Sequence, residues 1–150
     1  MPALLVLAPT ATKSDSDSIA RMARSGAELL LAPIVAAIPA EVDAPPGIRA
    51  VRVKRDGAPI TAVRLGMAQL TNTTATSVLL WPFAAADVPI TTLRALMDVA
   101  ALEPGALFAL ASLPLDLAPV IVPRDAWLEL VTLGEGGLDA LSARRRITRV

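Results

Sequence analysis

The residues of this sequence that could do chemistry are carboxylates, lysine, arginine and hydroxyls, because the chain contains no histidine and no cysteine. Thiolate nucleophiles, imidazole bases, disulfides and zinc sites of the usual ligand sets are therefore excluded. The remaining groups suit Mg²⁺-assisted phosphoryl or nucleotidyl transfer better than acyl transfer. Such chemistry would need acidic side chains to hold the metal.

Four aspartates are the candidate metal ligands: Asp15, Asp17, Asp87 and Asp116. Asp87 lies in the segment LLWPFAAADVP, in which an apolar run typical of a buried strand gives way to three alanines, and Asp116 precedes a further apolar run. A metal site would require these carboxylates to converge around one cleft beyond the strand ends. The alternative for Asp87 is a turn cap or a place in solvent.

The candidate anion-binding residue near the N-terminus is Lys13, in the hydroxyl-rich and acidic stretch TATKSDSDS. Loops that cradle phosphates use glycine so that several backbone N–H groups can converge on the anion, and this stretch has none. At an effective dielectric constant near 20, one carboxylate about 4 Å from a phosphate charge costs about 4 kcal/mol. Helix N-capping by Ser14, Asp15 or Ser16 is the alternative role for the stretch.

A second basic cluster, Arg144–Arg146, stands near the C-terminus. Solvated surface or charge at the end of a helix is the ordinary role of such residues, and anion binding is the alternative.

Apolar runs and periodic stripes predict the elements that position these residues. Strands are expected at 4–8, 48–53, 78–83, 106–111, 120–122 and 147–150. Helices are expected across 19–38 with a break near Ser25-Gly26, at 60–70, at 93–100 capped by Thr91 or Thr92, around 127–131 capped by Asp125, and within 134–146. Gly66 indicates that its helix lies tight on the sheet. The alternation predicts one three-layer α/β/α domain with a mostly parallel sheet.

Composition limits the partners and the compartment. Basic and acidic residues both number 14 and aromatics make up 3% of the chain, so nucleic-acid binding is not expected. The N-terminus has no signal-peptide pattern, and the longest apolar stretch is interrupted by prolines, so we expect a cytoplasmic protein that does not cross a membrane. Apolar residues at 54% favour a buried interface with a protein partner or a second copy.

Two segments resemble motifs of one enzyme family. The segment at Ala58–Leu70, APITAVRLGMAQL, is similar to a helix of the form GM-x-x-S-x-R-x-G-L, and it keeps Arg64 and Gly66. LLWPFAAADVPITTLRAL at Leu79–Leu96 is similar, without a gap, to LLLPVD-x-P-L-V-x-P-x-T-L-x-x-L. The residues on matching positions are Pro82, Val88, Thr92, Leu93 and Leu96.

Two more segments follow in the same order. Leu117–Leu130 is similar to G-H-P-V-L-F-x-x-x-x-F-x-x-L, and Gly134–Leu141 to G-D-x-G-x-R-x-L-L. The chain thus resembles the nucleotidyltransferases that include molybdenum cofactor cytidylyltransferase and molybdopterin guanylyltransferase. The resemblance implies a nucleotide-diphospho-sugar transferase-like fold, Mg²⁺ and a nucleotide as cofactors, and a position for Arg64 on the nucleotide side.

The departures from this family fall on its working residues. Ala84 stands where the family has the aspartate expected to hold Mg²⁺, and Ala86 stands where it has a proline. Leu117-Ala118 replace the glycine and histidine of G-H-P, and the family's Gly-rich loop corresponds to LAPTATKSDSDSIARM.

The leading hypothesis is therefore a degenerate member without catalytic residues, metal or cofactor, which acts by binding a protein partner or a ligand. Lys13 and Arg64 are its only candidates for residual contacts with a nucleotide. One alternative is an active Mg²⁺-dependent enzyme that uses CTP or GTP through Asp15, Asp17, Asp87 or Asp116 in a rearranged site. Another is a structural subunit or homodimer, suggested by Trp81 and Trp127.

Overall fold

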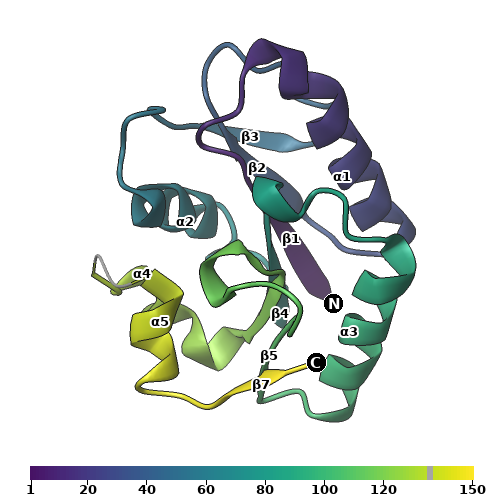
Figure 1. Cartoon of the computed structure of the whole chain (residues 1–150), viewed down its shortest axis with the longest axis vertical. Coiled ribbons are helices and arrows are strands. Elements are labelled where there is room, and N and C mark those ends of the chain that lie inside the picture. The colour runs from purple at the N-terminus through teal and green to yellow at the C-terminus, as the bar shows by residue number, and fades with distance from the viewer. Residues whose placement is uncertain (135–136) are drawn as a thin grey trace.

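The computed structural model describes residues 1–134 and 137–150 and arranges them as a sheet between two layers of helices (Figure 1). The sheet has seven strands in the order β3-β2-β1-β4-β6-β5-β7. Their bounds are β1 Pro2–Leu7, β2 Ile34–Ile38, β3 Arg49–Arg52, β4 Ser77–Pro82, β5 Leu107–Ala109, β6 Val120–Pro123 and β7 Ile147–Arg149. β6 runs antiparallel to β4 and β5, and the other pairs are parallel. The predicted fold class is confirmed.

Helices cover both faces of the sheet, with α1 and α3 on one side and α2, α4 and α5 on the other (Figure 1). The α-helices are α1 Ser16–Glu28, α2 Pro59–Ala68, α3 Ile90–Leu102, α4 Trp127–Val131 and α5 Gly137–Ser142. Short 3₁₀ turns are η1 Lys13–Asp15, η2 Phe83–Ala85, η3 Leu115–Leu117 and η4 Arg124–Ala126. No helix in the described ranges is both long and apolar enough to cross a bilayer.

Two hydrophobic cores explain why the central strands read as continuous apolar runs. Alternate residues of a strand point to opposite faces, and here both faces are covered. Leu4 packs with Ile19 of α1 and Leu96 of α3, whereas Leu5 packs with Met67 of α2. The four buried positions in each of β1 and β4 are therefore all apolar.

α2 lies close against β1 through Gly66, as its sequence position predicts. A Cβ atom at Gly66 would come within 2.4 Å of Leu5 Cδ1 and 2.7 Å of Leu5 Cδ2. Leu5 is fully buried, so it has little room to move away. A side chain at Gly66 would therefore push α2 off the sheet or displace Leu5.

The expected helix across 19–38 is wrong in its second half. Ile34–Ile38 forms β2, which pairs in parallel with β1 on one side and β3 on the other. A short apolar run cannot be assigned to helix or strand by periodicity alone, and Pro33 and Pro39, which flank this run, mark strand ends here. Gly26 does not break α1, which continues to Glu28.

Three predicted caps are also corrected. α3 begins at Ile90 with Pro89 as its N-cap residue, so Thr91 and Thr92 lie inside its first turn. Asp125 lies within η4 and makes no side-chain cap for α4, whose N-cap residue is Ala126. No side chain caps α3, and its first backbone bonds run from the N–H groups of Thr92 and Leu93 to the carbonyl of Pro89 at 3.0 and 3.2 Å.

Candidate functional site

The candidate site lies where β1 and β4 end side by side. The two strands are parallel and pair from Pro2 with Ser77 to Leu7 with Pro82. From β1 the chain moves to β2 and β3 on one side and then returns to β4 on the other side. Ligands of open α/β sheets bind outside the carboxyl ends of the strands at such a reversal of order. The segments that follow the two strands should therefore line any binding site.

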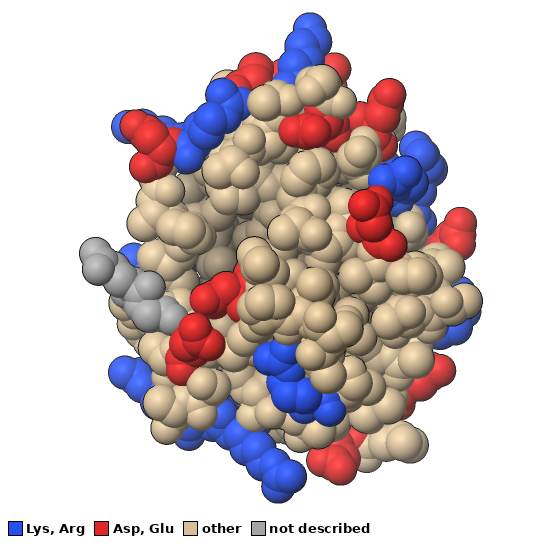
Figure 2. Space-filling view, viewed as in Figure 1, with Lys and Arg blue, Asp and Glu red and all other residues tan. Residues whose placement is uncertain are grey.

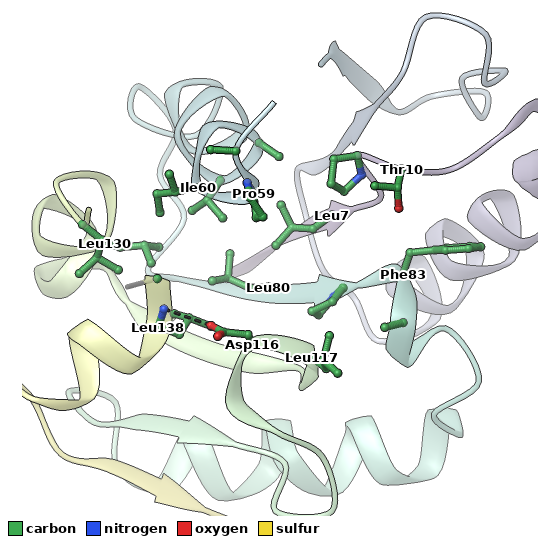
Figure 3. Close-up of a pocket in the computed structure, with 18 residues that line it drawn as sticks. Leu7, Thr10, Pro59, Ile60, Leu80, Phe83, Asp116, Leu117, Leu130 and Leu138 are labelled. Atoms are coloured by element: carbon green, nitrogen blue, oxygen red, sulfur yellow. Dashed lines mark hydrogen bonds between the residues drawn. The ribbon is translucent and has the colours of Figure 1, made fainter. Parts of the chain in front are cut away.

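A pocket of about 680 Å³ occupies this position. Figure 3 shows Leu7 and Leu80 from the two strands facing Ile60 of α2 and Leu138 of α5 across it. Figure 2 shows the hollow on the visible face, with uncharged surface around most of it and acidic side chains at its lower border. The full lining is Leu7, Pro9, Thr10, Ala58, Pro59, Ile60, Ala62, Val63, Leu80, Pro82, Phe83, Ala84, Asp116, Leu117, Leu130, Leu133, Gly137 and Leu138.

The turn η2 after β4 brings no polar side chain to the pocket. Phe83 and Ala84 line the wall, and Ala84 is exposed. Buried Trp81 holds the turn from beneath, because its indole N–H donates to the carbonyl of Ala85 at 2.8 Å. The position at which the resemblance expects a metal-binding carboxylate is therefore a methyl group on the wall of a pocket.

Asp116 is the only charged residue among the described residues that line the pocket. Its Oδ1 accepts a hydrogen bond from the backbone N–H of Leu138 at 3.3 Å, near the start of α5 (Figure 3). Gly137 allows this approach, because it has a φ of +56° and a Cβ atom there would lie 3.2 Å from Oδ1. Asp116 therefore helps to begin α5 and also lines the pocket.

The other three candidate carboxylates lie elsewhere. The Asp87 side chain is 99% exposed and lies 3.5 Å from Nη2 of Arg21. Asp15 is the N-cap residue of α1, as the sequence suggested, but its side chain makes no cap bond to that helix. Its Oδ2 instead accepts the backbone N–H of Thr12 at 2.7 Å, in a capping box at the start of η1. Asp17 is an exposed residue in the first turn of α1. None of these three lines the pocket.

A divalent metal does not fit this pocket. Mg²⁺ and Mn²⁺ prefer several hard oxygen ligands. The pocket supplies the carboxylate of Asp116, and the described residues contain no group of three or more acidic side chains placed to share a metal.

The loop after β1 does not form a phosphate cradle among its described hydrogen bonds. Pro9 has no N–H, the N–H of Ala11 donates to Ala8, and that of Thr12 donates to Asp15. Ala11 is buried, and its carbonyl accepts a bond of 2.7 Å from Arg55. These contacts direct the loop's polar groups inward, whereas phosphate binding needs N–H groups that point outward.

The candidate anion-binding residues are not gathered at the pocket. Lys13 is exposed on η1 and outside the lining. Arg64 reaches from α2 to the end of α4, where Nε donates to the carbonyl of Val131 at 2.9 Å and Nη2 donates to the carbonyl of Leu133. A role for either residue in nucleotide binding stays a prediction, and Arg64 would have to exchange these bonds for it.

In the C-terminal basic cluster, Arg145 is engaged by acidic neighbours. Its Nε donates to Glu129 at 2.8 Å and its Nη1 to Asp125 at 3.3 Å. The hydrogen bond to Glu129 and the charges of both carboxylates raise the pKa of Arg145 above its usual value. Arg145 is therefore part of an ion-pair network on the surface beside α4.

Both tryptophans belong to the interior and do not support an interface. Trp81 is 1% exposed and Trp127 is 7% exposed. The Trp127 indole donates to the carbonyl of Val122 at 3.1 Å, and the guanidinium of Arg124 lies over its ring. Self-association therefore stays a prediction that rests on composition.

Comparisons with solved structures show which fold the chain has. Rv0371c from Mycobacterium tuberculosis, in complex with manganese, superposes with a TM-score of 0.73 at 17% identity over 99% of this chain and 86% of that one. A nucleotidyl transferase from Methanothermobacter gives a TM-score of 0.68 at 13% identity, covering 100% and 86% of the two chains. The 2-C-methyl-D-erythritol 4-phosphate cytidylyltransferase of Thermus thermophilus gives 0.61 at 12% identity, covering 99% and 87%. The chain has the nucleotidyltransferase fold.

Sequence comparison adds nothing to this, since no family model and no curated protein matches the chain. The structural neighbours support the broad resemblance, whereas the narrower likeness to the molybdenum cofactor enzymes stays a prediction. Two residues of its fourth motif, Glu135 and Gly136, lie outside the described residues.

Ala84 and Asp116 could be identified from the sequence, whereas the apolar walls of the pocket could not. Ile60 and Val63 read as one face of a helix, and Leu130, Leu133 and Leu138 read as ordinary core positions. An apolar stripe carries no signal that tells a packed core from a pocket. The family motifs gave the only signal for the site, because they coincide with the carboxyl end of β4 and with the last residue of η3.

Proposed function

We propose that this chain is a degenerate nucleotidyltransferase-like domain that has lost metal-dependent catalysis and acts by binding a ligand or partner. The observation that carries the proposal is the composition of the pocket at the carboxyl ends of β1 and β4. Its wall holds Ala84 where the resemblance expects a metal-binding aspartate, and Asp116 is the single charged residue among the described residues that line it. None of these described lining residues is lysine or arginine.

Nucleotidyl transfer asks for groups that this pocket does not supply. The triphosphate carries several negative charges, which are neutralised in such reactions by a divalent metal and by cationic side chains. A lone carboxylate near those charges is unfavourable by about 4 kcal/mol per close pair at intermediate dielectric. Binding without catalysis therefore agrees best with the pocket, and the fold serves as a frame for it.

The alternative of an active enzyme with a rearranged site is favoured by one observation, the position of Asp116 in the pocket. It would need further carboxylates from Asp15, Asp17 or Asp87. Asp15 is bonded to Thr12 and Asp87 extends into solvent beside Arg21, so both would have to leave their present partners.

A pyrophosphate-release assay tests the proposal. The chain is incubated with each nucleoside triphosphate, with Mg²⁺ or Mn²⁺, and with sugar-phosphate acceptors that include 2-C-methyl-D-erythritol 4-phosphate, the acceptor in a neighbour's name. The expected result is no pyrophosphate above that of a heat-denatured control. Metal-dependent release that disappears in Asp116→Asn would instead establish the active alternative.

A further inference from the structure

We propose that the pocket binds a small apolar molecule that carries a protonated amine, with the ammonium group at Asp116 and the apolar body between α2 and the ends of β1 and β4. This inference rests on the proposed function, because it assigns the same pocket to a ligand other than a nucleotide. The side chains that line the pocket indicate the class of ligand.

The walls select an apolar body. Leu7 and Leu80 face Ile60 and Leu130 across the space, and Leu138 closes it on the side of α5 (Figure 3). The volume of about 680 Å³ falls within the range of small-molecule sites, which are mostly apolar with a few placed polar groups. A molecule that covers these side chains removes apolar surface from water, and that removal drives its binding.

The charge of the pocket selects a cation. Within the part of the lining that the structure describes, Asp116 is the single charged side chain and the hydroxyl of Thr10 is the single uncharged polar side chain. An anionic ligand would be desolvated against Asp116 with no lysine or arginine in the lining to pair with it. A cationic head group, in contrast, can pair with the carboxylate of Asp116 at the edge of the apolar surface.

Asp116 has hydrogen-bonding capacity left for that head group. An ionised carboxylate offers about four acceptor positions on its two oxygens. The backbone N–H of Leu138 takes one of them, on Oδ1, at 3.3 Å. That bond fixes the carboxylate at the start of α5, so the group that would receive the ammonium is already held in place before a ligand binds.

The ligand series that tests this proposal keeps one apolar body and changes its head group. Phenylbutylamine, phenylbutanol and phenylbutyrate are titrated into the full chain at neutral pH, and binding is followed by calorimetry and by saturation-transfer NMR. The amine is expected to bind tightest and the carboxylate weakest. Because Asp116 is partly open to solvent, the amine should gain about fivefold in affinity over the alcohol.

Three variants locate the site. Asp116→Asn keeps an oxygen that can accept from Leu138 and should make amine and alcohol bind equally. Asp87→Asn removes a charge from an exposed side chain outside the pocket and should leave the amine preference unchanged. Val63→Phe narrows the pocket from α2 and should abolish binding of all three probes. Thermal unfolding of each variant establishes that it remains folded.

The proposal is overturned if no probe binds, if the carboxylate binds as well as the amine, or if Asp116→Asn leaves the amine preference intact. Its failure is distinct from failure of the proposed function. Pyrophosphate release would reject the loss of catalysis whatever the amine does, whereas absence of both release and amine preference would reject this ligand class alone.

Discussion

At the scale of single residues, the proposed loss of metal-dependent catalysis depends on Ala84. The turn η2 after β4 presents Ala84 to the pocket, at the position where the resemblance expects a metal-binding aspartate. Trp81 fixes this turn by its hydrogen bond to the carbonyl of Ala85. Asp116, from η3, lines the same pocket. One carboxylate at position 84 would therefore place two acidic groups on one pocket wall.

We predict that Ala84→Asp creates a weak divalent metal site. A carboxylate about 4 Å from a bound divalent cation contributes on the order of 2 kcal/mol even in bulk water, so Mn²⁺ should bind about 30-fold more tightly than to the wild-type chain. Loss of the Mn²⁺ signal in electron paramagnetic resonance measures this binding.

The matched control is Ala86→Asp, which adds the same charge two residues away and outside the pocket lining. It should bind Mn²⁺ no better than the wild-type chain. Equal gains in the two variants would mean that the added charge acts through the overall field and that position 84 has no special relation to Asp116.

At the scale of elements, the close contact of α2 and β1 sets one wall of the pocket. Gly66 allows the helix to approach buried Leu5, and the same helix presents Ile60 and Val63 to the pocket. Arg64 extends from the helix to the carbonyls at the end of α4, which carries Leu130. The distance between α2, α4 and the sheet therefore defines the width of the pocket.

We predict that Gly66→Ala lowers the free energy of unfolding by about 1 kcal/mol. Overpacking against Leu5 costs about 1–3 kcal/mol, and the better helix propensity of alanine returns up to about 1 kcal/mol. Chemical denaturation measures the change. Gly105→Ala serves as the control, because a Cβ atom at Gly105 meets nothing within 4 Å, and it should change stability by less than about 0.5 kcal/mol.

A double-mutant cycle identifies the contact as the cause. In a Leu5→Ala background the added methyl group has space, so Gly66→Ala should cease to destabilise the chain. If the two substitutions are additive, the loss at Gly66 does not arise from Leu5.

The elements also show what could be predicted from sequence. The strands β1 and β4 and the helices α2 and α3 were predicted because polar or turn-forming segments separate their apolar patterns from the neighbouring ones, whereas the run of β2 directly follows the apolar end of α1. β2 was missed, because Ile34–Ile38 is apolar at every position and only its partners β1 and β3 make it a strand. The pocket walls were missed for a related reason, since pocket and core use the same residues.

At the scale of the whole molecule, the chain combines the nucleotidyltransferase fold with a pocket that lacks the charges for a metal–nucleotide complex. Its 14 basic and 14 acidic residues leave no net charge, so no overall field would draw a triphosphate to the pocket. The fold alone does not determine function, and the residues at the strand ends do.

Calorimetric titration of the wild-type chain with CTP and with GTP, each with and without Mg²⁺, tests this central claim most directly. If metal-dependent catalysis has been lost, neither nucleotide should give saturable binding at millimolar concentration, and Mg²⁺ should not change the binding of either. Micromolar binding that requires Mg²⁺ would contradict it, because such binding needs metal ligands that the pocket around Ala84 and Asp116 does not supply.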